Sequence, residues 1–217
     1  MENKALIVFA RSPKVGQVKS RLTSLISPRE AAEIYRAFLI DSLKQYEFLG
    51  VAVRLYMSVK KHLDFPVYGA TIWQQVGNDL GERMKHAFRE SAEAGYEQIV
   101  IIGTDHPTLP DTFIQDAFDA LSHRPTMSIG PTEDGGYYLL GMNPLINDLF
   151  DGMVYSQPDV YRLTLERAYH SGVNVVELPK WYDVDTPDDL KRLMADESLV
   201  PQNTLKVLQQ LRSKYKL

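Results

Sequence analysis

The sequence predicts an α/β fold: a single three-layer α/β/α domain built around a mostly parallel, mixed sheet. Short runs rich in Val, Ile and Leu alternate with longer segments of helical periodicity, which is typical of strands joined by crossover helices. A length of 217 residues, with 44% hydrophobic and 24% charged residues, suits one well-buried unit. Because no repeat, low-complexity tract or linker interrupts the pattern, residues 1–217 are expected to form one domain, with a helical extension from about residue 197.

Seven apolar runs are the candidate strands. They lie at 5–10, 51–57, 70–76, 98–103, 126–130, 137–142 and 173–178. The helix after the first of them has the clearest start, because Ser27, Pro28 and Glu30 have the spacing of a capping box with proline in the first turn. Gly50 is expected to end that helix.

Five more helices follow from the same reasoning. They are expected at 79–94, with Leu80, Met84, Ala87, Phe88 and Ser91 on one face, from about Pro110 to Leu121, from Ser156 to Gly172, from Thr186 onward, and at 204–216. In an open parallel sheet the loops that follow the strands converge at one edge, so the functional residues are sought in those loops.

Composition excludes several classes of function. A formal net charge of −4 argues against broad capture of nucleic acid, and the lack of cysteine excludes disulfides, thiolate nucleophiles and cysteine-based zinc sites. The apolar stretch at 5–10 is too short for a signal-peptide core, and no run is long enough to span a bilayer. We therefore expect a cytoplasmic protein with neither nucleic acid nor membrane as a partner.

The loop after the first strand, "RSPKVGQVKSRL" at 11–22, is basic. Four cations, Arg11, Lys14, Lys19 and Arg21, surround Gly16, and together they would neutralise a polyphosphate, while glycine would let the backbone approach it. The alternative is a set of solvated surface charges. The loop lacks the upstream glycine of a P-loop, and no G-x-G-x-x-G occurs in the chain, so neither nucleotide motif is present.

The strand at 98–103 runs into "GTDHP", which places Asp105 where a buried strand meets water. A carboxylate there is solvated, caps a helix or binds a metal. Pro107 and Pro110 delay the next helix, which makes Thr108 or Asp111 better caps than Asp105. His106 is a possible second ligand, although a lone histidine is more often structural.

Two further segments carry acids beside flexible or extended backbone. In "TEDGGYY", Gly135 and Gly136 form either a hairpin turn or a bare surface for a ligand beside Asp134. In "YDVDTP", Asp183 and Asp185 point the same way if the chain is extended, which suits Mg²⁺ or Mn²⁺. "DVDTP" also matches a phosphatase D-x-D motif, but the 32 residues after Asp185 are too few for the sheet that would follow it.

Five ordered motifs together resemble a known family. "FARSPKVGQVKSRL", "NDLGERM", "IGTDHPTLP", "DGGYYLLGM" and "YDVDTPDDL" are similar to proteins of the nucleotide-diphospho-sugar transferase (GT-A) superfamily described as radical-SAM/selenodomain-associated transferases (DUF2064-like). The likeness covers roughly residues 5–193. A more distant similarity extends to phospholactate and molybdenum cofactor guanylyltransferases.

The resemblance implies a role for each motif. Arg11, Gly16, Lys19 and Arg21 would meet the phosphates of a nucleotide, and Asp79, Leu80 and Gly81 would line its base. The metal, Mg²⁺ or Mn²⁺, would be held by Asp105 with Asp183 or Asp185. Asp134, Gly135, Gly136 and Tyr155 would line the acceptor side, where Tyr155 replaces the tryptophan usual before the Ser-x-Pro-Asp segment.

These observations lead to one principal hypothesis and one alternative. The principal hypothesis is a metal-dependent transferase that uses a nucleotide sugar or a nucleoside triphosphate and a small-molecule acceptor. Catalysis would be chiefly electrostatic, with Lys19 stabilising phosphate charge and Asp134 available as a base. The sequence supports glycosyl transfer and nucleotidyl transfer about equally. The alternative is a non-catalytic nucleotide-binding or regulatory module on the same fold.

Overall fold

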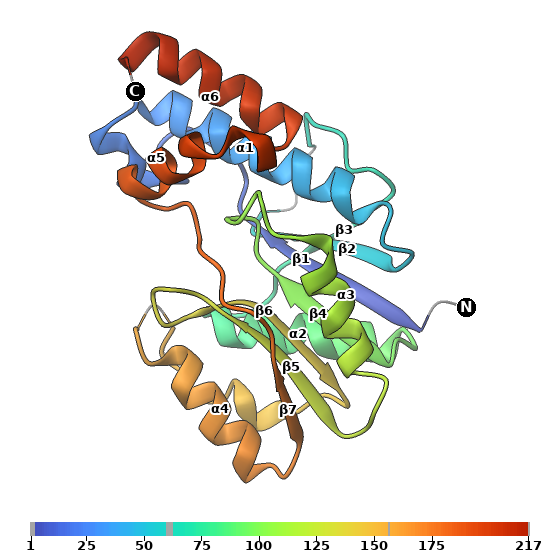
Figure 1. Cartoon of the computed structure of the whole chain (residues 1–217). Helices are drawn as coiled ribbons and strands as arrows, with labels where there is room; N and C mark the ends of the chain where they lie inside the picture. Colours follow the sequence, from blue (N-terminus) through green and yellow to red (C-terminus); the bar gives the residue numbers. More distant parts are fainter. Residues whose placement is uncertain (1–2, 60–62, 156, 217) are drawn as a thin grey trace.

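Seven strands form one sheet in the computed structural model, which describes residues 3–59, 63–155 and 157–216 (Figure 1). The sheet order is β3-β2-β1-β4-β6-β5-β7. The strands are β1 (Lys4–Ala10), β2 (Ala52–Met57), β3 (Thr71–Gln74), β4 (Gln98–Ile102), β5 (Thr126–Pro131), β6 (Tyr137–Asn143) and β7 (Asn174–Glu177). Only β6 runs antiparallel to its neighbours among these described strands, so the mostly parallel mixed sheet predicted from the sequence is confirmed.

Helices cover both faces of this sheet, which gives the three layers. They are α1 (Pro28–Tyr46), α2 (Leu80–Glu93), α3 (Asp111–Ala120), α4 (Val160–His170), α5 (Pro187–Ala195) and α6 (Gln202–Tyr215), with short 3-10 turns η1 (Ser20–Ser24), η2 (Asn147–Leu149) and η3 (Glu197–Leu199). Alternate residues of β1 serve the two faces: Leu6 and Val8 pack with α1 and α3, whereas Ile7 packs with α2 and α4.

The starts of α1, α2 and α5 have side-chain capping bonds. Ser27 Oγ accepts from the backbone of Glu30, whose carboxylate accepts from the Ser27 backbone N–H at 2.8 Å, so both halves of the capping box form. Thr186 and Asp189 form a second capping box at α5. Asp79 caps α2 through a 2.8 Å bond from the Glu82 N–H.

The C-terminal helix α6 lies along α1, as the upper part of Figure 1 shows. Buried Asp41 of α1 accepts hydrogen bonds from the Thr204 backbone N–H (2.7 Å) and hydroxyl (2.8 Å) at the start of α6. At the other end of α6, Glu30 accepts from Lys214 Nζ (2.7 Å) and the Tyr215 hydroxyl (2.6 Å). The first helix and the last are therefore tied together at both ends.

Three local expectations about the helices need correction. The helix expected from Ser156 begins at Val160 because Pro158 is held in a turn against Gly135, and Ser156 itself lies outside the described residues. Helix α3 begins without any side-chain cap, since the residue before it is Pro110; neither Thr108 nor Asp111 has that role.

Of the residues predicted to share one face of α2, Met84 and Phe88 are buried, whereas Leu80 is 43% exposed and lines the pocket described below. The last expected helix begins two residues earlier than predicted, at Gln202. Within the described residues, no helix combines the length and the apolar character needed to cross a membrane.

Candidate functional site

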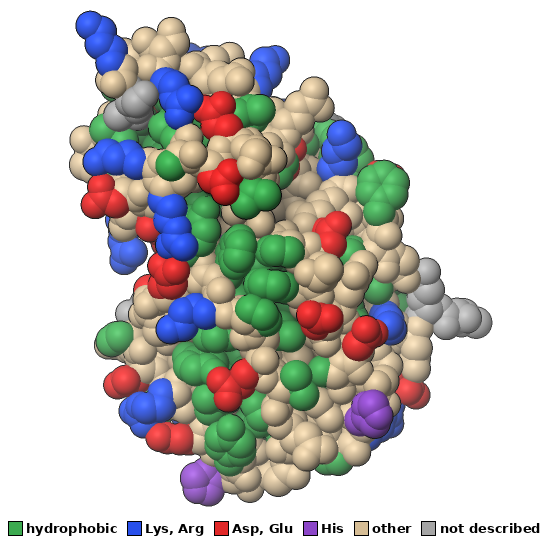
Figure 2. All heavy atoms as spheres, in the orientation of Figure 1, with side chains coloured by type: hydrophobic (Ala, Val, Ile, Leu, Met, Phe, Trp, Pro, Cys, Tyr) green, Lys and Arg blue, Asp and Glu red, His purple; other side chains and the backbone are tan. Residues whose placement is uncertain are grey.

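A pocket of about 970 Å³ lies at the edge of the sheet where β1, β2 and β4 end and β6 begins. The loops after β1 and β4, the start of α2, the β5–β6 turn and residues 183–185 all contribute to its wall. In the space-filling view a notch on the left separates the part that contains α5 from the part that contains α4 (Figure 2). A pocket at the carboxyl ends of parallel strands is where ligands bind in open α/β sheets.

Lys19 is at the centre of the charged end of this pocket. Its side chain is only 3% exposed, and Nζ lies 2.5 Å from Asp105 Oδ1 and 2.7 Å from Asp185 Oδ1. The backbone of Lys19 has φ of 49°, a left-handed conformation that is uncommon for lysine and costs about 1–3 kcal/mol. Because such strain persists only where the surroundings enforce it, the position of this ammonium group is closely specified.

The two carboxylates keep Lys19 charged despite its burial. Burial by itself lowers the pKa of Lys19, but the negative charges of Asp105 and Asp185 outweigh that effect and raise the pKa above its ordinary value. Burial likewise opposes ionisation of Asp105, and the nearby Lys19 ammonium outweighs it, so the pKa of Asp105 is lowered. The opposite charges of Lys19 and Asp105 therefore stabilise each other in the folded protein.

The same cluster fits a divalent cation in its donor chemistry. Two carboxylates from separate segments converge on one cation position, and carboxylate oxygens are the ligands that Mg²⁺ and Mn²⁺ prefer. Among the described residues no three acidic or histidine side chains converge on a single point. A metal held by Asp105 and Asp185 would therefore complete its shell with water or substrate oxygens, and it would compete with Lys19 for the position.

Arg11 and Arg21 are the exposed cations of the pocket wall. The Arg21 side chain is 73% exposed and lies 3.9 Å from Asp185, so it is free to reorient toward an anion. The backbone N–H of Arg11 donates to the buried Tyr35 hydroxyl at 2.8 Å, and Thr104 donates to the same oxygen at 3.3 Å. Tyr35 thus ties together the two loops that carry the expected phosphate-binding and metal-binding residues.

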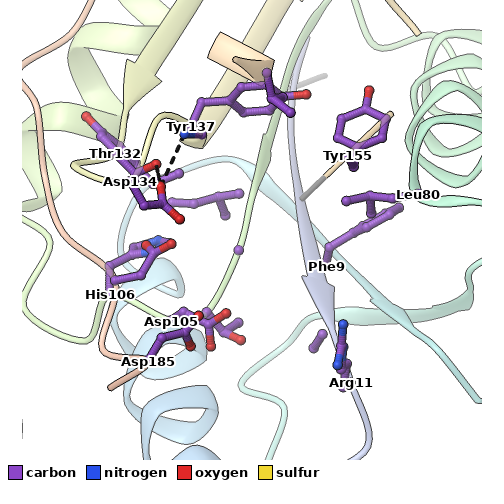
Figure 3. Close-up of a pocket in the computed structure, with 18 of the residues that line it drawn as sticks. Phe9, Arg11, Leu80, Asp105, His106, Thr132, Asp134, Tyr137, Tyr155 and Asp185 are labelled. Carbon is purple, nitrogen blue, oxygen red and sulfur yellow. Dashed lines mark hydrogen bonds and ion pairs between the residues drawn. The ribbon is translucent and has the colours of Figure 1, made fainter. Parts of the chain in front are cut away.

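His106 and Asp183 form a second polar group on the acidic wall, shown on the left of Figure 3 for His106. His106 is 3% exposed, and both of its ring nitrogens lack a hydrogen-bond partner. Asp183 Oδ1 is buried without a partner as well and lies 3.6 Å from His106 Nδ1, too far for a hydrogen bond. Asp183 and Asp185 thus line one pocket but face different partners.

Asp134 lies in the β5–β6 hairpin turn and also lines the pocket. Its Oδ1 accepts from the Thr132 hydroxyl at 2.5 Å and from the Gly136 backbone at 3.2 Å, which leaves Oδ2 unengaged by these donors. Gly135 has φ of 91°, and a Cβ there would lie 2.0 Å from the Pro158 carbonyl oxygen. Only glycine fits this turn without displacing the segment before α4.

The wall opposite the acids is apolar and aromatic. Phe9, Leu80 and Tyr155 lie together on the right of Figure 3, across the opening from His106 and Asp105. Tyr155 packs directly on Gly81, where a Cβ would lie 2.9 Å from the tyrosine ring. The residues expected to line the base side and the tyrosine expected on the acceptor side are therefore neighbours.

The structure brings most of the predicted site residues into this one pocket. Its lining includes Arg11, Lys19, Arg21, Leu80, Asp105, Asp134, Gly136, Tyr155, Asp183 and Asp185. Four predicted residues are not part of the lining: Gly16, Asp79, Gly81 and Gly135. Gly16 is in a turn with φ of 76° after Lys14, and Asp79 is the cap of α2, so both have local structural roles.

Sequence reasoning missed Tyr35 as a site residue. Its spacing is that of an apolar position on the first helix, and nothing in the local pattern reveals that its hydroxyl reaches two loops distant in sequence. Gln75 was missed too. Its amide donates to the Ala10 and Tyr56 carbonyls at the ends of β1 and β2, and the signal available was its place near the end of the strand predicted at 70–76.

Comparison with known proteins gives a match at 33% identity over the full length and other matches at much lower identity. A crystal structure from Desulfovibrio desulfuricans G20, assigned as a nucleotide-diphospho-sugar transferase, has 33% sequence identity and a TM-score of 0.90 and covers 99% of each chain. A cytidylyltransferase from Leptospira borgpetersenii serovar Hardjo-bovis (strain JB197) has 13% identity and a TM-score of 0.58 over 99% of this chain and 95% of its own.

The homologue of Mycobacterium tuberculosis Rv0371c from Mycobacterium sp. strain JC1 has 17% identity and a TM-score of 0.56 over 92% of this chain and 98% of its own. At these identities the cytidylyltransferase and the Rv0371c homologue show the fold alone. Residues 53–157 match the family model described as "Uncharacterized protein conserved in bacteria (DUF2064)". No curated protein matches the sequence.

Proposed function

The chain belongs to the DUF2064 family on the nucleotide-diphospho-sugar transferase fold, and from that premise we propose that it is a divalent-metal-dependent transferase. Its donor is an activated nucleotide, either a nucleotide sugar or a nucleoside triphosphate, and its acceptor is a small molecule. The observation that carries the proposal is the convergence of Asp105 and Asp185 on one cation position beside Arg11 and Arg21.

Different charged residues bind the phosphates of the donor and the metal ion. Arg11 and Arg21 are exposed at the pocket wall and bind the phosphate oxygens. Asp105 and Asp185 hold Mg²⁺ or Mn²⁺, which when bound neutralises charge on the leaving phosphate. Lys19 occupies that position otherwise and keeps the two carboxylates apart and oriented.

Asp134 is the base that this pocket offers. Its Oδ1 is fixed by Thr132 and Gly136, so Oδ2 is presented for a proton. The acceptor oxygen bonds to the transferred group, and the bond from that group to the donor phosphate breaks with its electron pair on the phosphate. The acceptor proton passes to Asp134, and pyrophosphate or a nucleoside diphosphate leaves.

Donor binding is the first test. Thermal shift is measured with GTP, CTP, UDP-glucose and GDP-mannose, each with and without Mn²⁺, because a ligand that binds only the folded state raises the midpoint. Arg21→Gln should weaken the donor about fivefold. Arg29→Gln, which removes an 81% exposed cation on the outer face of α1, should leave donor affinity unchanged. A pocket that no nucleotide stabilises would refute the proposal.

Product formation then distinguishes the possible outcomes. Release of pyrophosphate identifies nucleotidyl transfer, whereas release of a nucleoside diphosphate identifies glycosyl transfer. A donor-dependent shift without release of either product, across all acceptors tried, would favour the non-catalytic nucleotide-binding module.

A further inference from the structure

The charges of the pocket are separated between its walls. The cations come from the β1 loop and α2, namely Arg11, Lys19, Arg21 and Arg83, whereas the acids come from residues 105, 134, 183 and 185. Lys19 and Arg21 face Asp105 and Asp185. Within the described part of the chain, neither Asp134 nor Asp183 has a lysine or arginine partner, so their side of the pocket is negative.

That side also holds polar atoms that nothing in the protein satisfies. Both ring nitrogens of His106 and the Oδ1 of Asp183 are buried without a hydrogen-bond partner, and both residues line the pocket. In proteins such atoms almost always have a partner, because leaving them unpaired is costly. Figure 3 places His106 between Asp134 and the Asp105–Asp185 end, facing the opening. A bound molecule that both donates and accepts hydrogen bonds would satisfy this group.

We infer that the acceptor is an uncharged molecule with several hydroxyl groups, of the sugar or polyol class, and that His106 and Asp183 bind its hydroxyls beside Asp134. The inference rests on the proposed function and specifies the chemical class of its acceptor. A hydroxyl donates to a carboxylate oxygen and accepts from, or donates to, an imidazole nitrogen. A phosphorylated acceptor would instead bring negative charge against Asp134 and Asp183, whereas the lysine and arginine side chains of the lining come from the β1 loop and α2.

Matched pairs of acceptors test the inference on the donor-loaded protein. The donor is the nucleotide found by thermal shift, and the pairs are glycerol and glycerol 3-phosphate, glucose and glucose 1-phosphate, and mannose and mannose 1-phosphate. In at least one pair, we expect the neutral compound to bind at least tenfold more tightly than its phosphate ester. A phosphorylated twin that binds equally well or better overturns the inference, and so does a panel in which no neutral member adds to the donor-induced shift.

Two variants connect the selectivity to the named residues. Asp183→Asn should reduce the preference for the neutral member at least fivefold, because it removes the repulsion of phosphate. His106→Leu should weaken the neutral acceptor about tenfold, yet leave the melting temperature without acceptor unchanged or higher, because it removes two unpaired nitrogens. Asp188→Asn is the matched control, since its side chain is 90% exposed on α5.

The outcomes distinguish a wrong acceptor class from a wrong proposed function. Unchanged acceptor affinity in both pocket variants overturns the inference even if the wild-type protein prefers neutral acceptors. Loss of the donor-induced shift in the wild-type protein would instead refute the proposed function. A donor shift that survives in Asp183→Asn and His106→Leu shows that the variants act on the acceptor alone, as the inference requires.

Discussion

Replacing Lys19 by methionine should convert the charged cluster into a site that depends on metal for stability. Methionine keeps the length of the side chain and the same left-handed backbone, so the main change is the loss of the ammonium between Asp105 and Asp185. Removing one partner of a fully buried ion pair costs about 3–5 kcal/mol. Both carboxylates are 41% exposed toward the pocket, and water will therefore reduce the cost to about 2–3 kcal/mol.

The expected change is large enough to measure by calorimetry or thermal shift. For a chain of this size, 1 kcal/mol corresponds to roughly 2–4 °C, so Lys19→Met should melt about 4–12 °C below the wild-type protein in the presence of EDTA. Mn²⁺ at about a hundred times its dissociation constant should raise the free energy of unfolding of Lys19→Met by about 2.7 kcal/mol. The wild-type protein should gain less from Mn²⁺, because the metal must displace Lys19.

Two controls make the experiment decisive. Lys206→Met changes an exposed lysine on α6 and should alter neither the stability nor the response to Mn²⁺. Adding Asp105→Asn to Lys19→Met should abolish the stabilisation by metal. If Mn²⁺ stabilises Lys19→Met no more than the wild-type protein, Asp105 and Asp185 are not metal ligands, and the pair is a structural anchor for Lys19 only.

Three further predictions concern the support of the site. Burial opposes ionisation of Glu30, but hydrogen bonds from Lys214, Ser27 and Tyr215 outweigh it and lower its pKa to about 2, so its stabilisation is present above its ordinary pKa and is lost as pH falls toward 2. Unfolding followed from pH 7 to pH 2 should therefore show Glu30→Gln less stable by up to about 3 kcal/mol near neutrality, with the difference vanishing in acid. Gly135→Ala should cost about 2–3 kcal/mol or more in denaturant unfolding, because its Cβ would overlap the Pro158 carbonyl; a near-neutral effect would show that the turn can relax. Tyr35→Phe should weaken donor binding several-fold with the fold intact by circular dichroism, because the ends of β1 and β4 lose their shared hydroxyl; unchanged affinity would contradict its positioning role.

The elements were predictable because their signals are local. The Ser27 and Thr186 capping boxes depend on four consecutive residues each, and both form as expected. The strands follow from short apolar runs, and the rule that ligands bind beyond the ends of parallel strands located the pocket. The start of α4 was misplaced because Pro158 is held by Gly135, more than twenty residues earlier, and no local pattern records that contact.

The arrangement within the site was not predictable in the same way. The sequence assigned Lys19 to phosphates and Asp105 and Asp185 to a metal, but the contacts of Lys19 with both acids depend on its left-handed backbone, and Asp185 comes from a segment 166 residues away. The placement of Tyr155 against Gly81 likewise depends on the path of the chain before α4. Such contacts follow from tertiary packing, and residue type alone constrains them weakly.

The distribution of satisfied and unsatisfied groups argues that the cluster serves a ligand and not only the fold. Two carboxylates that join α1 to α6 are well supplied with donors: Asp41 accepts four hydrogen bonds from the start of α6, and Glu30 accepts from Ser27, Lys214 and Tyr215. In the pocket, by contrast, His106 and Asp183 Oδ1 are buried and unpaired, and Lys19 is strained. Selection for stability alone would remove such groups, because apolar replacements cost less than unpaired polar atoms. Buried unpaired atoms also occur elsewhere in the described residues, as at Gln98 and Asn143, but those of His106 and Asp183 belong to residues that line the pocket, where a substrate can supply the missing partner.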